Sequence, residues 1–287
     1  MANEIAIVSG KGGTGKTTIC AALAMFAGDV VLADCDVDAP DLHIILQPTI
    51  KSSSDFVGSQ VAIIDENQCT ECGLCEQACR FHAIADSLVN PIACEGCGVC
   101  AHVCPENAVQ MTDRQSGALY VSETRIVNMV HAKLFPGEGN SGKLVTEVRK
   151  LSTAIADEQE THTVLIDGSP GIGCPVIATV TGIRLGVIVT EPTMSGIHDM
   201  KRVLDLLKRF RITATVIINK FDLNLTNTEA IEQYCQENDI EVLGKIRFDS
   251  IMTQSMVAAK SLPEFAPNHE ISLLLKRIWR RITDFIT

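Results

Sequence analysis

The segment GKGGTGKT, residues 10–17, constrains the fold of this chain more than any other feature. It follows a short apolar run, Ile5–Val8, that predicts a buried parallel strand. It precedes the run Thr17–Ala27, which predicts a helix with few breakers. A glycine-rich turn between a strand and a helix, ending in lysine and a hydroxyl residue, is the pattern of a phosphate-binding P-loop. We therefore expect an α/β fold with a mostly parallel sheet flanked by helices.

The residues of the loop have distinct expected roles. Lys16 would bridge the β- and γ-phosphates of a nucleotide, and the hydroxyl of Thr17 would ligate Mg²⁺. The backbone N–H groups and the helix N-terminus would bind phosphate oxygens. The expected nucleotide-binding residues are Gly10, Gly12, Gly13, Thr14, Gly15, Lys16, Thr17 and Thr18.

Lys11, a second lysine ahead of Lys16, gives the loop its resemblance to a known family. The motif resembles the deviant Walker A of the MinD/ParA ATPases, a group that includes the nitrogenase iron protein and the Mrp-type cluster carriers. The resemblance implies ATP or ADP as ligand and a dimer in which Lys11 contacts the partner's nucleotide. There it would neutralise charge on the transferred phosphoryl group. The alternative is that Lys11 is a solvated loop residue.

Acidic residues follow a second predicted strand, Val30–Ala33. The run from Asp34 through Asp36 to Asp38 resembles switch I of the same family. The resemblance implies that Asp36 positions the attacking water and that Asp34 or Asp38 supports Mg²⁺. A solvated acidic turn is the alternative.

Two later strands end in residues that extend the resemblance. Val164–Asp167 and the following residues 168–171 resemble a Walker B strand with switch II, which implies that Asp167 belongs to the magnesium shell, with Thr17 and Asp36, directly or through water. Asn219, at the end of another apolar run, matches the family's base-binding asparagine. Because residues 219–222, Asn-Lys-Phe-Asp, also fit the guanine-binding pattern of GTPases, GTP stays an alternative to ATP. The expected catalytic residues are Lys11, Lys16, Asp36 and Asp167.

A cysteine-rich block between residues 69 and 104 has a different character. Two runs share the spacing C-x2-C-x2-C-x3-C, and Pro105 follows the second. This is the spacing of bacterial ferredoxins with two [4Fe–4S] clusters, in which the fourth cysteine of each run ligates the other cluster. One cluster would then take Cys69, Cys72, Cys75 and Cys104, and the other Cys94, Cys97, Cys100 and Cys79. Zinc is the main alternative, because paired C-x2-C units also suit tetrahedral sites.

The cysteine block interrupts the nucleotide-binding motifs, so we expect an inserted α+β ferredoxin domain. The expected organisation is a first part of the ATPase domain at 1–59, the insert at 60–112 and the second part at 113–287. The whole chain resembles MinD-superfamily ATPases with an inserted ferredoxin domain, a type often described as cobyrinic acid a,c-diamide synthase. The insert carries seven acids and one base, Arg80, a balance that would suit docking to a basic redox partner.

Cys174 lies seven residues after Asp167, where the nitrogenase iron protein has a cysteine that binds an intersubunit cluster. The second cysteine position of that protein corresponds here to Asn140. A dimer would therefore offer two thiolates instead of four, and we expect no stable intersubunit cluster. Cys174 would hold a transient metal or simply pack, and we expect Cys20 and Cys235 to pack in the core.

Composition constrains the expected cellular compartment and the expected ligands of the protein. Twelve cysteines without a signal peptide indicate a reduced, cytoplasmic protein. A net charge of −11 argues against nucleic-acid binding. Apolar residues recur at helical spacing in the C-terminal tail from Ile271 to Ile286, with basic residues mostly off that stripe. We expect a core helix there, and a membrane-surface helix is the alternative.

These features predict a nucleotide-dependent iron–sulfur ATPase. ATP binding and hydrolysis in a homodimer, or in a heterodimer with a paralogue, would be coupled to electron transfer toward a redox or metallocluster partner. One alternative is an ATPase that assembles or carries iron–sulfur clusters. Another is a positioning ATPase whose ferredoxin insert senses redox state. The expected cofactors are ATP or ADP, Mg²⁺ and two [4Fe–4S] clusters.

Overall fold

The computed structural model describes residues 2–286 and divides the chain into two compact units. Unit 1 comprises residues up to 53, 119–133 and from 141 onward, and unit 2 comprises 54–118 and 134–140. The predicted insert, 60–112, lies within unit 2. The unit is longer than this insert because two long strands continue beyond it on both sides and because residues 134–140 pack with them.

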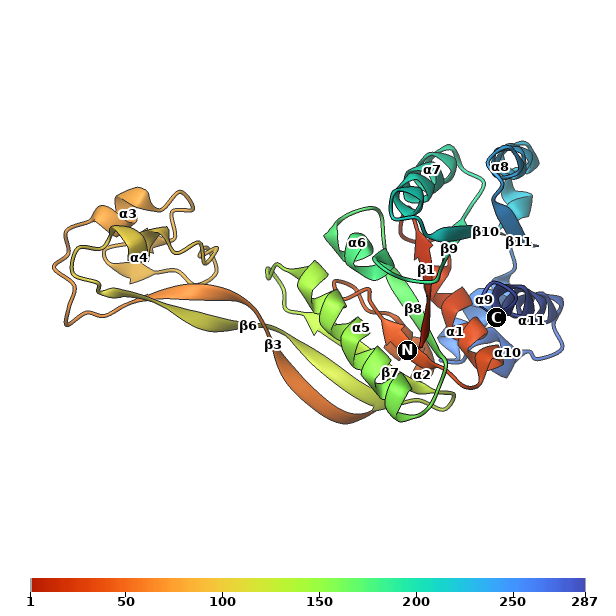
Figure 1. Cartoon of the computed structure of the whole chain (residues 1–287), viewed down its shortest axis with the longest axis horizontal. Helices are drawn as coiled ribbons and strands as arrows, with labels where there is room; N and C mark the ends of the chain where they lie inside the picture. Colours follow the sequence, from red (N-terminus) through yellow and green to blue (C-terminus); the bar gives the residue numbers. More distant parts are fainter. Residues whose placement is uncertain (1, 287) are drawn as a thin grey trace. The chain divides into compact units, whose positions relative to one another are not determined.

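Unit 1 is built on a mostly parallel sheet (Figure 1). Its strand order is β11-β10-β9-β1-β8-β2-β7, continued by the neighbouring strands β6 and β3. The strands are β1 Asn3–Ser9, β2 Val31–Asp34, β7 Asn128–Leu134, β8 Thr163–Pro170, β9 Leu185–Thr190, β10 Thr213–Asn219 and β11 Glu241–Ile246. The pairs from β11 to β7 are all parallel. The expected α/β fold with a mostly parallel sheet is therefore confirmed for unit 1.

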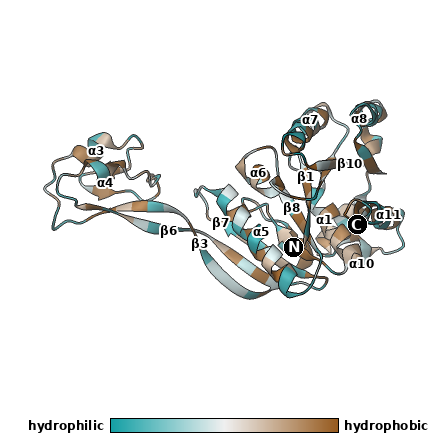
Figure 2. Cartoon of the chain, in the orientation of Figure 1, coloured by the Kyte–Doolittle hydropathy of each residue, from teal (hydrophilic) through white to brown (hydrophobic). Residues whose placement is uncertain are grey.

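Helices cover both faces of this sheet. On one face α1 packs with α2, α10 and α11, and on the other α5 packs with α6 while α7 packs on β9 and β10. Figure 2 shows apolar central strands beside helices such as α7 and α8 that carry polar residues. The helices are α1 Lys16–Ala27, α2 Leu42–Leu46, α5 Ser141–Glu158, α6 Cys174–Val180, α7 Met194–Arg209, α8 Leu225–Glu237, α9 Ser250–Val257, α10 Leu262–Phe265 and α11 Glu270–Thr283, with the 3₁₀ turn η1 at Phe221–Leu223.

Alternation along the strands builds the larger core. Ile5 and Ile7 of β1 and Leu165 of β8 have no exposed surface and pack with the buried faces of α1 and α11. In α11, Leu275 and Ile278 are fully buried. The prediction of a core helix at the C-terminus is therefore confirmed. None of the described helices combines the length and apolar character that crossing a bilayer requires.

Unit 2 has a smaller core and little regular structure beyond two long strands. Strands β3 Thr49–Ile64 and β6 Val109–Glu123 pass through both units, and only their residues 54–64 and 109–118 belong to unit 2. Two helices, α3 Leu74–Ala78 and α4 Val99–Val103, pack together, and β4 Ile84–Ala85 pairs antiparallel with β5 Leu88–Val89. The core consists of Ala62, Ile84, Cys100 and Val109, with further cysteines packed against it.

The two cysteine runs form local structures of the same kind. Each run has a glycine before its helix, Gly73 at φ 75° and Gly98 at φ 74°, in the left-handed region that favours glycine. The helices α3 and α4 have five residues each, and each is followed directly by the last cysteine of its run. The repeated spacing in the sequence therefore corresponds to a repeated backbone path.

Candidate functional sites

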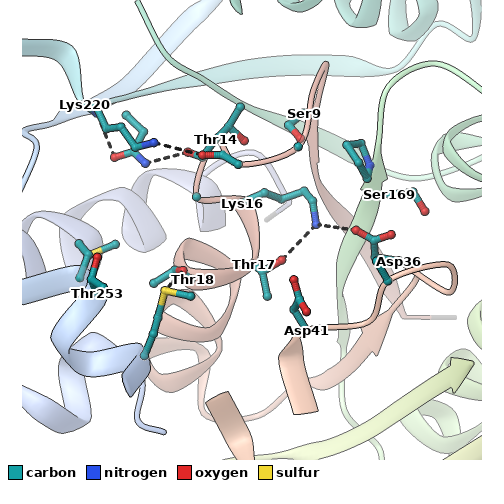
Figure 3. Close-up of a pocket in the computed structure, with 18 of the residues that line it drawn as sticks. Ser9, Thr14, Lys16, Thr17, Thr18, Asp36, Asp41, Ser169, Lys220 and Thr253 are labelled. Atoms are coloured by element: carbon teal, nitrogen blue, oxygen red, sulfur yellow. Dashed lines mark hydrogen bonds and ion pairs between the residues drawn. The ribbon is translucent and has the colours of Figure 1, made fainter. Parts of the chain in front are cut away.

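A cavity of about 620 Å³ opens at the carboxyl ends of the parallel strands of unit 1 (Figure 3). Residues 12–18 of the glycine-rich loop line one side, and Ser169 and Pro170, at the end of β8, line another. This is the edge where open α/β sheets bind ligands. Of the predicted loop residues, only Gly10 does not line the cavity. An added Cβ at Gly10 would lie 2.4 Å from Cβ of Asp199, so this glycine permits close packing of the loop on α7.

Lys16 lies at the centre of an acidic group. Its Nζ is 2.7 Å from Oδ1 of Asp167 and 4.0 Å from Oδ2 of Asp36, and it donates to the hydroxyl of Thr17 at 3.3 Å. Burial by itself would lower the pKa of Lys16, but the Asp167 carboxylate, followed by Asp36 and Asp34, outweighs burial, so the pKa is raised. The ammonium is therefore charged and binds carboxylates at the position where a phosphate would compete for it.

Two buried carboxylate oxygens beside Lys16 lack a hydrogen-bond partner in the described chain. They are Oδ2 of Asp34 and Oδ2 of Asp167, and both residues are fully buried. Burial and the nearby Asp167 raise the pKa of Asp34 well above its usual value. Burial also raises the pKa of Asp36 to about 6. A cation would satisfy these oxygens, so the donor set fits Mg²⁺ bound directly or through water.

Hydrogen bonds join the three segments that were predicted to contact phosphate. The N–H of Cys35 donates to the carbonyl of Asp167 at 2.8 Å, and the hydroxyl of Ser169 donates to the carbonyl of Cys35 at 2.7 Å. The N–H of Gly171 donates to the carbonyl of Ser9 at 2.8 Å. The predicted switch I, switch II and P-loop segments are therefore in direct contact with one another.

Asn219 is hydrogen-bonded to the backbone of the P-loop. Its Nδ2 donates to the carbonyl of Thr14 at 2.7 Å, and its Oδ1 accepts from the N–H of Lys220 at 3.0 Å. Gly15 has φ 88°, and a Cβ there would lie 2.5 Å from Asn219 Nδ2. Asn219 lines the cavity as predicted, but both ends of its amide have partners within the chain. A role in binding the base stays a prediction.

Lys11 does not line the cavity. Its Nζ lies 2.5 Å from Oε1 of Glu191 and 3.2 Å from the hydroxyls of both Thr193 and Ser195. Lys220 contacts the other oxygen of Glu191 at 3.2 Å. Hydrogen bonds and charge attraction from the two lysines outweigh partial burial and lower the pKa of Glu191. Lys11 is thus bound within its own chain by the segment that follows β9.

One wall of the cavity was missed by the sequence analysis. It is formed by the end of β11 and by α9, with the lining residues Arg247, Phe248, Asp249, Met252, Thr253 and Met256. A sequence signal was present, because a short strand with the apolar residues Val242, Leu243 and Ile246 ends immediately before Arg247, and the carboxyl end of a parallel strand lies at the same edge as the P-loop. No short motif marks these residues, so only the sheet order brings them to the site.

The eight cysteines of unit 2 line two separate cavities. The first is lined by Cys69, Cys72, Cys75 and Cys104, and the second by Cys94, Cys97, Cys100 and Cys79. In each, three cysteines of one run meet the last cysteine of the other. These are the two ligand sets that the ferredoxin spacing predicts, although iron binding by them stays a prediction.

The donor chemistry of these cavities can be compared with that of a cluster. Within residues 2–286 no three His, Cys, Asp or Glu side chains converge on one point as ligands of a single ion. A cubane cluster instead takes one thiolate at each of four irons, so its ligands surround a cavity. Backbone N–H groups of Ala83 and Ala108 donate to the sulfurs of Cys79 and Cys104, both at 3.3 Å. Such bonds suit thiolate sulfur, and we conclude that the residues fit two clusters.

The other four cysteines lie in unit 1. Cys20, Cys35 and Cys235 are buried, and burial raises the pKa of each thiol. The packing predicted for Cys20 and Cys235 is therefore confirmed. Cys174 is exposed at the start of α6. A Cβ added at Gly142 would lie 3.3 Å from Cβ of Cys174, so the starts of α5 and α6 are in close contact.

Comparison with known proteins decides the family. The sequence pattern of the CobQ/CobB/MinD/ParA nucleotide binding domain (CbiA) matches residues 5–260. The chain belongs to this family. An uncharacterized protein of Methanocaldococcus jannaschii is 32% identical over 286 residues, covering 99% of this chain and 97% of the relative. The septum site-determining protein MinD of Bacillus subtilis is 23% identical over 292 residues, covering 98% and 89%.

Solved structures of MinD share the fold of this family member. The septum site-determining protein MinD complexed with Mg-ADP from Pyrococcus horikoshii superposes with a TM-score of 0.62 at 18% identity, covering 98% of this chain and 96% of that one. The prediction of a nucleotide-binding domain of the MinD/ParA group is therefore confirmed at the level of the family, and the solved structure supports its fold. The family match alone does not assign the cysteine block or the role of Lys11.

Proposed function

We propose that this protein is an ATP-dependent iron–sulfur ATPase that couples nucleotide binding and hydrolysis to electron transfer toward a redox or metallocluster partner. The observation that carries the proposal is the arrangement of the eight cysteines in unit 2. They line two cavities, and each cavity combines three cysteines of one run with the last cysteine of the other. This sharing is the ligand arrangement of a two-cluster ferredoxin.

ATP is the proposed nucleotide. A GTPase of the N-K-x-D type needs the carboxylate of Asp222 at the base. Here Asp222 does not line the nucleotide cavity, and its Oδ1 accepts from the N–H of Phe248 at 2.6 Å. The alternative of GTP therefore lacks its defining carboxylate at the cavity. The walls formed by Phe248, Met252 and Met256 suit an aromatic base bound through apolar contacts.

The acidic group around Lys16 supports a simple exchange on nucleotide binding. The β- and γ-phosphates would compete with Asp167 for the ammonium of Lys16, to which Asp167 Oδ1 is bonded at 2.7 Å. Release would leave the Asp167 carboxylate free to take part in the Mg²⁺ shell with the hydroxyl of Thr17. Asp36, in the segment after β2, would accept a hydrogen bond from the attacking water. The bonds from Cys35 and Ser169 would transmit the change between the two switch segments.

Dimerisation is part of the proposal. Lys11 would leave Glu191, Thr193 and Ser195 and contact the nucleotide of a second subunit, either another copy or a paralogue. The exchange replaces one anionic partner, the Glu191 carboxylate, by another, the phosphates. Because Lys220 also contacts Glu191, that carboxylate would keep a cation after Lys11 departs. Movement of Lys11 to the nucleotide of a second subunit would therefore leave no buried charge unpaired at Glu191.

In unit 2 the cysteine thiolates would hold two [4Fe–4S] clusters, which when bound supply one-electron transfer. The N–H groups of Ala83 and Ala108 would stabilise negative charge on the sulfurs of Cys79 and Cys104. Partial burial of the cavities by Ala62, Ile84 and Val109 would limit access of water. The acidic surface of the insert would direct a basic partner toward it.

An assembly or carrier ATPase is a second candidate because Cys174 is exposed beside switch II. In that case Cys174→Ser would abolish transfer of a metal or cluster to an acceptor protein, whereas electron transfer through unit 2 would be unaffected. If the protein transfers electrons only, Cys174→Ser should behave as the wild type in both assays.

A positioning ATPase is a third candidate because MinD is among the relatives. The apolar face of α11, which a membrane-bound form would need, is packed in the core of unit 1. Sedimentation with anionic liposomes, with and without Mg-ATP, tests this candidate: binding that requires ATP would favour it over electron transfer.

Iron analysis after oxygen-free purification tests the cluster assignment. We expect about eight irons per chain for the wild type and for Cys174→Ser. Because Cys79 and Cys104 would each ligate the cluster of the other run, Cys79→Ser should perturb the cluster held by Cys94, Cys97 and Cys100, and Cys104→Ser the other one. The two variants should therefore differ in which EPR signal is altered. An iron-free wild type, or stoichiometric zinc in its place, would contradict the assignment.

A further inference from the structure

Residues 134–140, Leu-Phe-Pro-Gly-Glu-Gly-Asn, form a tether that the nucleotide mechanism does not use. They connect β7 to α5, both largely in unit 1, but they pack as part of unit 2. The tether is held to the β3–β6 strands at its two ends. The N–H of Phe135 donates to the carbonyl of Ser116 at 2.9 Å, and Nδ2 of Asn140 donates to the carbonyl of Gly58 at 2.7 Å.

A charged pair fixes the middle of the tether. The carboxylate of Glu138 has a side chain only 7% exposed and pairs with the guanidinium of Arg114, on β6. A second nitrogen of Arg114 donates to the carbonyl of Pro91, three residues before Cys94. Arg114 thus connects the tether to the loop that leads into the second cysteine run. A guanidinium suits this position because its planar group can serve two acceptors at once.

The same tether is connected through the chain to both sides of the nucleotide site. At its start, β7 pairs with β2, and His131 of β7 is in register with Asp34, where switch I begins. At its end, α5 begins at Ser141, and Gly142 is in close contact with Cys174, which lies just after switch II. A movement of either switch that displaces β7 or α5 would therefore reach residues 134–140, which are hydrogen-bonded to β3 and β6 of unit 2.

We propose that Arg114, Glu138 and Asn140 are positioning residues that couple the nucleotide state to the cysteine-bearing loop at residues 89–98. The inference rests on the proposed function, because it assumes that nucleotide binding changes the conformation of unit 2. It adds the route: from switch II through the start of α5 to Asn140, and from Glu138 through Arg114 to the carbonyl of Pro91. Coupling free energies between sites typically correspond to 5- to 150-fold effects.

Hydrogen–deuterium exchange tests this route without requiring catalytic activity. Full-length protein, purified without oxygen, would be labelled with and without Mg²⁺ and the non-hydrolysable ATP analogue AMPPNP. In the wild type, exchange of residues 89–98 should change on adding the analogue. In Glu138→Gln and in Asn140→Gly, the change should be reduced by about fivefold or more. Protection of the P-loop by the analogue should be the same in all variants.

The choice of variants guards against a merely structural effect. Asn140 has φ 70°, so glycine at this position keeps the backbone while removing the bond to Gly58. Exchange of the charges, Arg114→Glu with Glu138→Arg, should restore part of the response that Arg114→Glu alone loses. Glu123→Gln is the matched control, because it breaks an exposed ion pair with Lys51 on the same two strands. It should respond as the wild type does.

The outcomes separate the inference from the proposed function. If Glu138→Gln and Asn140→Gly keep the wild-type response, the tether is not the coupling route. Coupling of the nucleotide site to unit 2 would still hold. No response in the wild type, despite protection of the P-loop, would contradict both. A response lost in the tether variants but kept in Glu123→Gln is the result that the inference requires.

Discussion

Lys11 and Lys16 lie five residues apart in one loop, yet their ammonium groups have different partners. Lys16 is almost completely buried and contacts Asp167, whereas Lys11 is partly exposed and contacts Glu191. The sequence alone shows which lysine ends the P-loop, because only Lys16 is followed by a hydroxyl residue and a helix. It does not show the partner of Lys11, because Glu191 lies 180 residues farther along and only the sheet brings the two together.

Replacing Lys11 separates nucleotide binding from hydrolysis. Lys11→Ala should bind Mg-ATP as tightly as the wild type, because the side chain does not line the cavity. Hydrolysis should fall by about 10³-fold or more, the loss expected for a cation that stabilises the phosphoryl transition state. Isothermal titration and phosphate release measure the two quantities. Lys150→Ala, at an exposed i,i+3 pair, is the control, and equal rates for Lys11→Ala and the control would exclude a catalytic Lys11.

His131 gives a pH dependence of stability. Burial, with a smaller effect of His43, lowers the pKa of His131 to about 4, and its Nε2 lies 2.9 Å from the hydroxyl of Ser122. The unfolded chain therefore binds a proton near pH 6.5 that the folded chain binds only near pH 4. The resulting stabilisation is complete above about pH 6.5 and is lost as the pH falls toward 4. It amounts to at most about 3 kcal/mol.

His131→Gln should weaken this pH dependence. The variant should lose less stability than the wild type between pH 7 and pH 5, as measured by urea unfolding of the protein at each pH. His198→Gln, at an exposed histidine, should keep the wild-type slope. An unchanged slope in His131→Gln would show that His131 does not titrate differently in the folded state.

At the scale of elements, four strands of unit 1 (β1, β2, β8 and β10) were predictable because each contains a short apolar run that ends at a residue of a predicted nucleotide-binding motif. The strand Ile5–Val8 corresponds to β1, and Val30–Ala33 corresponds to β2 within one residue at each end. Periodicity also identified α11. The extent of β3 and β6 was not predictable, since both are long and largely polar where they pass between the units. The extent of β3 and β6 is set by hydrogen bonding to neighbouring strands, which their composition does not reveal.

The helix α11 stabilises unit 1 through its apolar face. Ile278 is fully buried, and a Cβ added at Gly244 of β11 would lie 2.7 Å from its Cδ1. Ile278→Ala should therefore lower the free energy of unfolding by about 3 kcal/mol. Leu273→Ala, on the exposed face of the same helix, should change it by no more than about 0.5 kcal/mol. Similar losses for the two variants in chemical denaturation would contradict the packing of α11.

At the scale of the whole molecule, the sequence indicated a nucleotide-binding chain with a cysteine-rich insert. The P-loop and the cysteine runs are local motifs, and each is defined by the spacing of its residues. Both could therefore be recognised without knowledge of the three-dimensional fold. The tether at residues 134–140 could not, because nothing in Phe135 or Glu138 indicates that a loop before α5 packs on β3 and β6. The wall formed by α9 was missed for the same reason: long-range contacts place it.

If the nucleotide site governs the cysteine-bearing unit, EPR spectra of the dithionite-reduced protein should depend on nucleotide. Spectra would be recorded without oxygen in the absence and presence of Mg-ATP, for the wild type and for Lys16→Ala, which should not bind nucleotide. We expect iron–sulfur signals whose line shape or midpoint potential changes with Mg-ATP in the wild type and stays constant in Lys16→Ala. Iron–sulfur signals that are identical with and without Mg-ATP in the wild type would contradict this expectation.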